Sequence, residues 1–401
     1  MSETPYAVRQ FALSPEHEQY AAHVRSVAEE HLAGIPAVHG GVNRPLLKAL
    51  GSHGLLRGLF GGAPDQPPRD AAAMQLCLLR ETLARVSTEA ETALALQGLG
   101  SYPILQSGNA ETVARWIPGV VTGEAVAGFA LSEPDAGSDA AALSLAATKD
   151  GDGWRLSGEK LWISNAPEAD VYAVFARTTP DSRGRGVTAF VVPGVADGLS
   201  GEALEMVAPH AIGRLVLDGV RVGPDDVLGD VDAGFAVAMR TLDLFRPSVG
   251  AFAVGMAQAA LDATLDWVTT RQVYGDALVR QQSVEHTLAE MATKVQASRL
   301  LVRAAASSYD AGAPRAEITT SAAMAKLFAT ESAQWVVDQA VQLHGARGLQ
   351  RGHLLERLYR EVRAPRIYEG ASEVQRTIIG RGLVFQHQWQ SHLQDGKKGH
   401  A

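Results

Sequence analysis

One acidic side chain near the C-terminal end has neighbours that suggest chemistry. In the segment "RIYEGASEVQR", residues 366–376, Glu369 lies between Tyr368 and Gly370 and follows a stretch rich in Arg. A Gly directly after the acid lets the backbone turn sharply and lets another molecule approach closely. From these residues alone, the carboxylate either serves a bound molecule or is a solvated turn acid.

Two segments in the middle of the chain carry polar groups at strand ends. In "GFALSEPDAGSD", residues 128–139, a strand ends at Ser132 and a turn follows, whose N–H groups and hydroxyls could hold a phosphate or the polar edge of a ring. In "EKLWISNA", Trp162 could stack on a flat cofactor. An ordinary β-turn and a sheet-core Trp are the alternatives.

Two further segments lie where helices end. In "TTRQVYGDALVRQQ", Arg271 stands at the end of a helix, where a guanidinium can bind phosphate oxygens or pair with an acid or a carbonyl. In "QLHGARG", Gly345 either lets a ligand approach the backbone or simply caps the helix. Each of these signals is weak by itself.

Composition limits the kind of protein. The chain has 401 residues, of which 46% are hydrophobic and 20% charged, as expected for a folded protein of two or three domains. The net charge is −8 and no run of Lys or Arg stands out, so we expect no nucleic-acid partner. The single Cys77 cannot form an internal disulfide and fits a reducing cytoplasm. We expect neither a secretory signal nor a membrane span.

Residue patterns predict a mostly α fold with a small β domain. Residues 1–124 are read as a helical domain, in which "SPEHEQY" begins a helix with a Ser cap and Pro at its first position. Residues 125–231 form a central domain of antiparallel strands, and residues 232–401 form a C-terminal helical bundle. The long C-terminal helices have apolar residues on more than one face, which fits either oligomer packing or burial within one subunit.

Taken together and in this order, "LSEPDAGSD", "EKLWISNA", "QLHGARG" and "RIYEGASEVQR" resemble the acyl-CoA dehydrogenase family. The resemblance covers nearly everything from the N-terminal helices to about Gly382. It implies an N-terminal helical domain, a central β domain and a C-terminal four-helix bundle. It also implies non-covalent FAD, usually a homotetramer, a role in fatty-acid or amino-acid catabolism, and an electron-transfer flavoprotein as acceptor.

The resemblance also implies roles for single residues. Phe129, Leu131 and Ser132 would line the flavin ring, and Trp162 and Ser164 would flank it. Gly137 and Ser138 would lie beside the pyrophosphate. The pyrophosphate and adenosine end of FAD would be contacted from a neighbouring subunit, by Arg271, Tyr274, Gln342, Gly345 and Ala346. Each FAD would then bridge two chains.

By the same resemblance, Glu369 is the catalytic base, which removes the α-proton of an acyl thioester while the β-hydrogen passes as hydride to flavin N5. Its backbone N–H would polarise the thioester carbonyl, and the product would be a trans-2-enoyl thioester. Other members carry the base just before an Arg on a bundle helix, but Phe245 stands there and cannot accept a proton. The substrate contacts that follow are Ser138, Arg246, Tyr368 and Gly370, and the acyl pocket lies along residues 92–105.

One departure from the family pattern keeps alternatives open. Pro209, His210 and Ala211 replace a Lys-Met-Gly-Ile-Arg-like stretch near the entrance of the thioester channel. The thioester could therefore sit on an acyl carrier protein instead of CoA. An oxygen-using oxidase or monooxygenase and a non-catalytic flavin-bound scaffold are the other readings.

Overall fold

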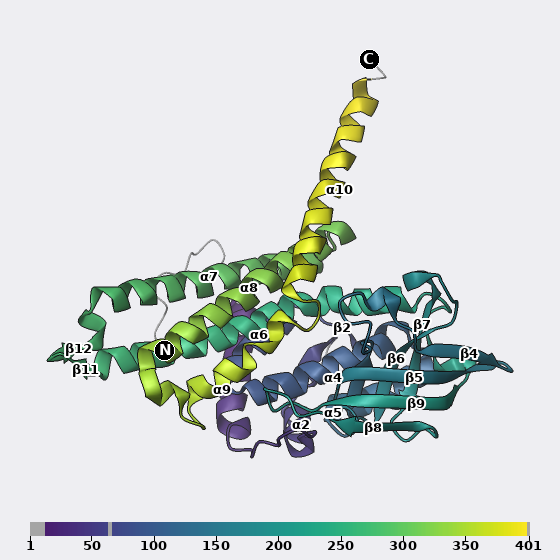
Figure 1. The fold of residues 1–401 in the computed structure, drawn as a ribbon, viewed down its shortest axis with the longest axis horizontal. Coiled ribbons are helices and arrows are strands. Elements are labelled where there is room, and N and C mark those ends of the chain that lie inside the picture. Colours follow the sequence, from purple (N-terminus) through teal and green to yellow (C-terminus); the bar gives the residue numbers. More distant parts are fainter. Residues whose placement is uncertain (1–12, 63–65, 399–401) are drawn as a thin grey trace. The chain divides into compact units, whose positions relative to one another are not determined.

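The computed structural model describes residues 13–62 and 66–398. It divides into two compact units, Met1–Phe245 and Arg246–Ala401, and helix α6 (Gly234–Thr270) contains the boundary. Figure 1 shows helices at both ends of the sequence and a sheet formed by its middle, which confirms the predicted fold class. The domain limits at residues 124 and 231 stay a prediction.

Five α-helices begin the first unit, and polar caps start several of them. They are α1 (Pro15–Val27), α2 (Arg44–Ser52), α3 (Ala73–Val86), α4 (Thr88–Ser107) and α5 (Ala110–Thr122). As predicted, Ser14 caps α1, because its hydroxyl accepts a hydrogen bond from the N–H of His17 at 3.2 Å. Ser87 and Asn109 cap α4 and α5 in the same way.

The sheet of the first unit has eight strands. They are β3 (Ala127–Ala130), β4 (Ala146–Asp150), β5 (Gly153–Ser164), β6 (Val171–Arg177), β7 (Val187–Pro193), β8 (Leu199–Ala203), β9 (Ile212–Val222) and β10 (Val227–Leu228). Their order is β10-β7-β6-β4-β5-β9-β8, with β3 paired to β6. Most pairs are antiparallel, as predicted, whereas β3 and β4 each run parallel to β6. Two short hairpins, β1 (Phe60–Gly61) with β2 (Arg69–Asp70) and β11 (Gln272–Val273) with β12 (Asp276–Ala277), lie outside this sheet.

Helix α4 holds β3 through one buried amide. The side chain of Gln97 donates to the carbonyl of Ala125 and accepts from the N–H of Ala127, both at 2.7 Å. The helix approaches the strand closely at Gly100, where a Cβ atom would lie 2.6 Å from the backbone of Ala127 and Gly128. This contact positions the strand that leads to Ser132.

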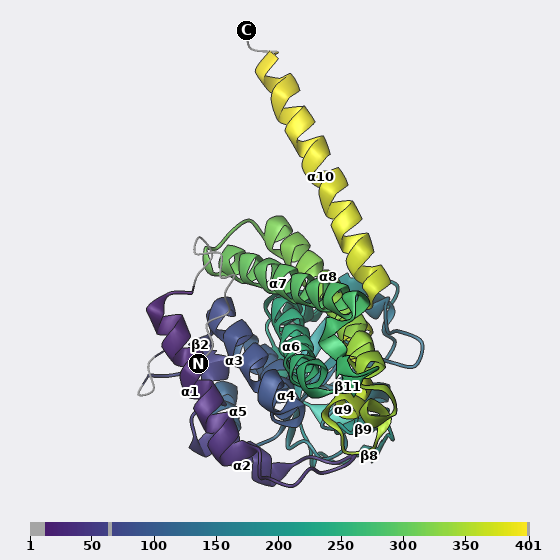
Figure 2. The same ribbon diagram turned by 90° about the vertical axis from the view of Figure 1, so that its left-hand side faces the viewer.

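The second unit contains the remainder of α6 together with α7 (Gln282–Asp310), α8 (Arg315–His344), α9 (Leu354–Glu361) and α10 (Ser372–Lys398). Figure 2 shows α7 and α8 packed side by side, and α10 extends beyond them. The buried face of α8 consists mostly of small residues such as Ala325, Ala329 and Ala333. The larger Phe328 is 39% exposed, so the alanines form the core face of this helix.

Within the described chain, α6 is the helix that is long and apolar enough to cross a membrane by length and composition alone, which the residue pattern did not predict. In the structure, 78% of its apolar window is buried inside the protein. Core helices of globular proteins show the same combination, so the pattern is weak evidence for a span.

We expect Gly100→Ala to lower the free energy of unfolding by about 1–3 kcal/mol, because the added methyl group must push α4 away from β3. Gly380→Ala is the matched control: it lies in helix α10, and nothing is within 4 Å of the position of its Cβ. This control should leave stability unchanged or raise it slightly. Urea denaturation of both variants measures the difference, and equal stabilities would contradict the close approach.

Candidate active site

The backbone around Glu369 has an unusual conformation. Glu369 and Gly370 both have positive φ angles, +53° and +95°. A left-handed conformation costs a residue other than Gly about 1–3 kcal/mol and persists only when surrounding contacts hold it. The turn at residues 368–371 is therefore fixed by its neighbours.

Three buried side chains donate hydrogen bonds to the carbonyl groups of this turn. The ammonium group of Lys326 donates to Gly370 O at 2.8 Å. The amide of Gln375 donates to the same oxygen at 2.8 Å and to Glu369 O at 3.2 Å. Arg246 Nε donates to Glu369 O at 3.3 Å. All three donors are at most 5% exposed, so the turn is anchored from inside the helical unit.

One oxygen of the Glu369 carboxylate is shielded from water, although the residue as a whole is half-buried. Its Oε2 atom has less than 1 Å² of exposed surface, whereas the preceding residues Ile367 and Tyr368 are 59% and 37% exposed. This burial argues against a solvated turn acid, which was the alternative in the sequence.

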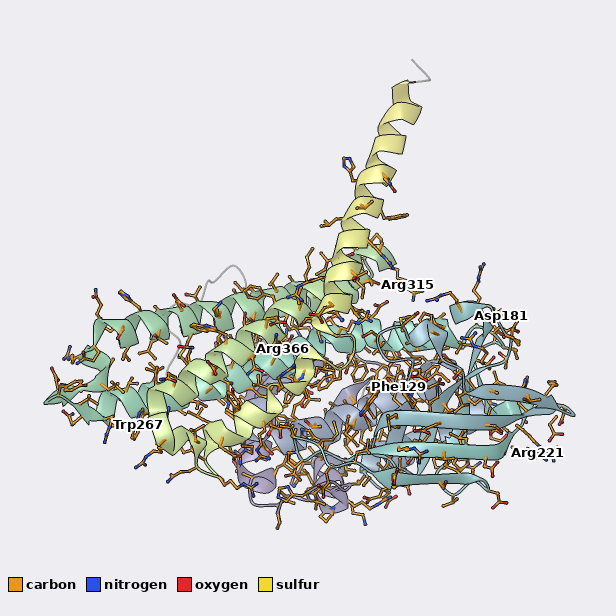
Figure 3. All side chains as sticks on the ribbon, viewed as in Figure 1. Phe129, Asp181, Arg221, Trp267, Arg315 and Arg366 are labelled. Carbon is orange, nitrogen blue, oxygen red and sulfur yellow. The ribbon has the colours of Figure 1, made fainter. Side chains whose placement is uncertain are left out.

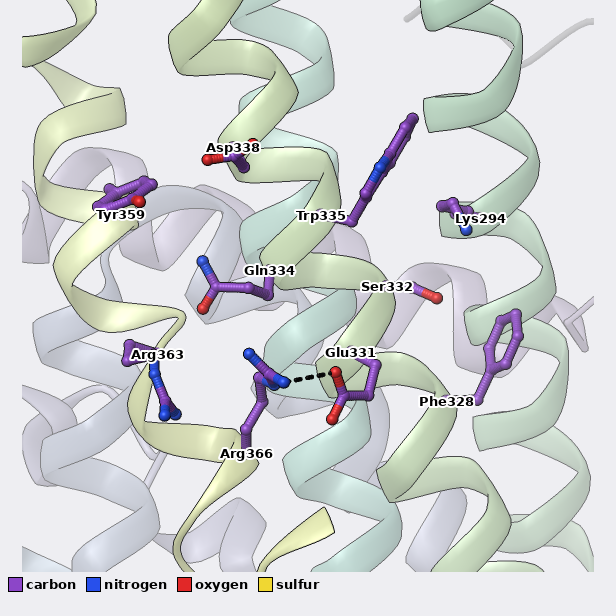
Figure 4. Close-up of a pocket in the computed structure, with 10 residues that line it drawn as sticks. All are labelled: Lys294, Phe328, Glu331, Ser332, Gln334, Trp335, Asp338, Tyr359, Arg363 and Arg366. Carbon is purple, nitrogen blue, oxygen red and sulfur yellow. Dashed lines mark ion pairs between the residues drawn. The ribbon is translucent and has the colours of Figure 1, made fainter.

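Glu331 ties both ends of the turn to α8. The hydroxyl of Ser372 donates to Glu331 Oε1 at 2.5 Å, and Arg366 pairs with Oε2 at 2.9 Å, as Figure 4 shows. Burial alone would raise the pKa of the Glu331 carboxyl, but these two partners and Arg376 outweigh burial and hold that pKa below its usual value. Glu331 is therefore ionised at neutral pH and keeps both contacts.

The first unit contains a second buried anchor, under the segment predicted to line a flavin. Lys160 on β5 donates to Leu131 O at 2.9 Å and to Glu133 Oε1 at 2.8 Å. Glu133 also accepts hydrogen bonds from the N–H groups of Ser144 and Leu145. The lysine is fully buried and Glu133 is 4% exposed, so this ion pair fixes residues 131–133 against the sheet.

Burial and pairing shift both pKa values in this ion pair. Burial lowers the pKa of Lys160 to about 8, although the charge of Glu133 opposes the shift. Burial would raise the pKa of Glu133, but the charge and hydrogen bond of Lys160 and the two backbone N–H groups lower it overall. At neutral pH both groups are charged.

Trp162 lies on a bulge of β5 and not in the core of the sheet. The pairing of β5 with β9 shifts between Lys160 and Ile163, and Trp162 has a φ of +57°. Its side chain is 49% exposed. The alternative of a sheet-core Trp is therefore wrong, and the bulge instead presents the indole at the surface of the first unit.

The other predicted flavin residues of this unit surround the same strand ends. Phe129, labelled in Figure 3, and Leu131 are 8% and 7% exposed, while Ser132 and Ser164 are half-buried. Gly137 and Ser138 are exposed in the following turn, and nothing lies within 4 Å of where a Cβ on Gly137 would be. An exposed indole, hydroxyl groups and an open Gly turn fit a flat ring with polar edges and an attached pyrophosphate.

The predicted cofactor residues of the second unit share one end of its bundle. Tyr274 is 97% exposed at the tip of the β11–β12 hairpin, with Arg271 beside it. The guanidinium of Arg271 lies 5.7 Å from the ring centre of Trp267, whose N–H donates to Leu343 O. The three others, Gln342, Gly345 and Ala346, are also exposed. This group can contact a ligand of another molecule.

The structure adds residues to the site that sequence reasoning missed. Glu133, Lys160, Lys326 and Gln375 had no predicted role, yet they hold the two segments that did. A sequence signal was present for Lys326, which interrupts the apolar stretch "AAMAKLFA", whereas Lys160 follows Glu159 and gives no such signal. Arg246, predicted to contact substrate, bonds to the backbone of Glu369.

A pocket of about 660 Å³ opens between α7, α8 and α9 of the second unit (Figure 4). Phe328, Trp335 and Tyr359 give it aromatic walls, and Glu331 and Arg366 belong both to it and to the anchor of the turn. No group of three or more His, Cys, Asp or Glu in residues 13–62 and 66–398 could hold a metal ion.

Three family models match most of the chain, between residues 14 and 384. The acyl-CoA dehydrogenase N-terminal domain matches residues 14–124, the middle domain residues 128–220 and the C-terminal domain residues 232–384. Cyclohexane-1-carbonyl-CoA dehydrogenase of Geobacter metallireducens is 33% identical over 372 residues, which cover 90% of this chain and 95% of that protein.

Solved structures of other proteins share this fold. Butyryl-CoA dehydrogenase from Megasphaera elsdenii is 31% identical with a TM-score of 0.86, over 93% of this chain and 99% of that one. PigA with FAD and proline is 25% identical with a TM-score of 0.85, over 94% and 99%. The chain therefore belongs to the acyl-CoA dehydrogenase family, and it is an oxidoreductase of that family.

We expect Lys160→Met to lower the free energy of unfolding by about 3–5 kcal/mol, because it leaves the charge of Glu133 buried without its cation. Arg183→Met is the control. It breaks an ion pair with Asp139 in which both side chains are more than half exposed, so it should cost at most about 1 kcal/mol. Equal losses in urea denaturation would show that the Lys160 pair is not the anchor.

Proposed function

We propose that this chain is an FAD-dependent dehydrogenase that introduces a Cα–Cβ double bond into an acyl-CoA thioester, with Glu369 as the base. The buried Oε2 atom of Glu369, on an anchored left-handed turn, carries this proposal. Membership of the family supports it, as do the names of the relatives, which act on cyclohexane-1-carbonyl-CoA and butyryl-CoA.

The chemistry requires a strong, well-placed base. The α-proton of a thioester is too weakly acidic for water to remove, so a positioned carboxylate must accept it. Glu369 takes that proton, and its anchored turn fixes the backbone from which the carboxylate projects. Bound FAD would supply the acceptor for the β-hydrogen. The product is the trans-2-enoyl thioester.

Residues of the first unit fit the flavin. Trp162, which is exposed, would cover the ring, the hydroxyls of Ser132 and Ser164 would bond to its polar edges, and the open turn at Gly137 and Ser138 would hold the pyrophosphate. The ion pair of Lys160 and Glu133 keeps the segment from residue 131 to 133 in place for this role. PigA, which shares the fold, is a structure with FAD.

A homotetramer is the proposed assembly, in which each FAD is shared by two chains. Tyr274 is almost fully exposed at a hairpin tip, and α8 carries Phe328 and Trp335 away from its alanine core face. Of these, Tyr274 and Phe328 are exposed and Trp335 is half-buried, and exposed aromatic residues mark interfaces between chains. An electron-transfer flavoprotein is the proposed acceptor, and the cytoplasm the proposed location.

An acyl carrier protein thioester remains a second candidate substrate because Pro209, His210 and Ala211 depart from the family pattern. PigA with FAD and proline shares the fold, and proline is not a CoA thioester, so substrates other than thioesters stay open. An oxygen-using flavin oxidase or monooxygenase is therefore kept as a third candidate. Rapid reoxidation of the reduced flavin by air would favour that third reading.

Glu369→Gln should bind the same acyl thioesters as the wild type but reduce the flavin about 10²–10⁴-fold more slowly, because the amide cannot accept the proton. The measurement is an anaerobic titration of both proteins with straight, branched and cyclic acyl-CoA and acyl-carrier-protein thioesters, followed by flavin absorbance. Reduction of the variant at the wild-type rate would exclude Glu369 as the base. Failure of every thioester to reduce the wild type would exclude the dehydrogenase.

Arg271→Ala should weaken FAD retention at least tenfold, because a guanidinium binds phosphate oxygens, and it should not unfold the chain, because Arg271 is exposed. The control is Arg155→Ala on β5, which removes an exposed ion pair with Asp150. FAD content after dialysis and thermal unfolding measure the two effects. Equal retention in both variants would contradict the predicted contact.

A further inference from the structure

Lys326 occupies a place in α8 that packing does not explain. It is fully buried, and the other buried residues of this helix are Ala, Val, Ser, Thr and one His. Removing an ammonium group from water is costly unless hydrogen bonds and opposite charges compensate. A Met side chain would fill the same space without that cost. The lysine therefore needs another reason to be there.

The side-chain hydrogen bond of Lys326 leads to the turn that carries Glu369. Its ammonium donates to Gly370 O at 2.8 Å, beside the amide of Gln375, which bonds to the same oxygen. The turn begins and ends at residues held by Glu331, five positions further along α8. One rigid helix thus fixes the turn at its two ends and at its centre.

Charges around Lys326 make its protonation relevant to Glu369. Burial lowers the pKa of Lys326 to about 8, the carboxylates of Glu369, Glu331 and Glu373 raise it, and Arg246 lowers it further. At pH 7 the ammonium is charged. A nearby positive charge favours the ionised form of a carboxylate, which is the form that a base needs.

We propose that Lys326 is a positioning residue: together with Gln375 it holds the carbonyl groups of residues 369 and 370, and its charge keeps the carboxylate of Glu369 ready to accept a proton. The inference rests on the proposed function, because only a catalytic Glu369 gives this charge a kinetic effect.

The test compares Lys326→Met and Gln375→Met with the control Thr330→Val. Lys326→Met removes a donor and a charge, and Gln375→Met removes a donor without a charge. Thr330 is also fully buried on α8, one turn beyond Lys326, and its hydroxyl bonds only within the helix, to Lys326 O and Leu327 O. It therefore reports on packing of α8 without touching the turn.

Two readouts are measured on the FAD-loaded protein. The first is the anaerobic rate of flavin reduction by butyryl-CoA, or by the acyl-CoA that reduces the wild type fastest, from pH 5.5 to 9. The second is amide hydrogen exchange of the peptide spanning residues 366–376, which needs no thioester. Far-ultraviolet circular dichroism and FAD content establish that each variant is folded.

We expect Lys326→Met to slow reduction at pH 7 at least tenfold, because the turn that carries Glu369 loses a hydrogen-bond donor. The rising limb of the pH profile should move upward by about 1 unit, because the carboxylate loses its neighbouring cation. Gln375→Met should slow reduction without moving that limb. Both should speed exchange in peptide 366–376, and Thr330→Val should change none of these quantities.

Several results would overturn the inference. They are an unchanged rate and pH profile in Lys326→Met, unchanged exchange in both Met variants, or the same changes in Thr330→Val. If Lys326→Met does not fold, the rate of flavin reduction and the amide exchange of Gln375→Met are the measurements that test whether the turn must be held. A wild type that no thioester reduces would instead reject the proposed function, and the exchange data would still test whether Lys326 and Gln375 hold the turn.

Discussion

Buried ammonium groups bonded to loop carbonyls are the interactions on which the candidate site depends. Lys160 on β5 holds Leu131 O in the first unit, and Lys326 on α8 holds Gly370 O in the second. A buried cation is tolerated only where acids and carbonyl oxygens surround it, so each lysine needs the segment that it holds. A strand and a helix thereby hold two loop segments in fixed positions, and a precise binding or catalytic site requires such fixed positions.

Backbone strain is also found in the same places. Trp162, Asn165 and Glu369 all have positive φ angles although none is Gly. Asn165 is held by a bond from its amide to Ala127 O, and Glu369 by the donors around its turn. Strained residues persist only where contacts over-determine them, and they cluster at functional sites. Buried contacts thus hold strained conformations in both of the predicted ligand-binding segments.

Local patterns could predict the elements and the residues at their ends. The Ser14 cap, the strands, the long helices and the Glu369 turn follow from spacing and from Gly, Pro and cap residues. The anchoring roles of Lys160 and Lys326 could not be predicted from the sequence. The carbonyl groups that they bind are 29 and 44 residues away, and only folding brings each pair together. The parallel pairing of β3 with β6 was missed because alternation of side chains carries no information on strand direction.

The central claim is that this chain breaks the α-C–H bond of an acyl thioester by proton transfer to Glu369. Its most direct test is the anaerobic rate of flavin reduction by butyryl-CoA carrying deuterium at both α positions, compared with the unlabelled compound. The account predicts reduction that is several-fold slower with the deuterated thioester. Equal rates, in a protein whose chemical step is shown to be rate-limiting by single-turnover measurement, would contradict it.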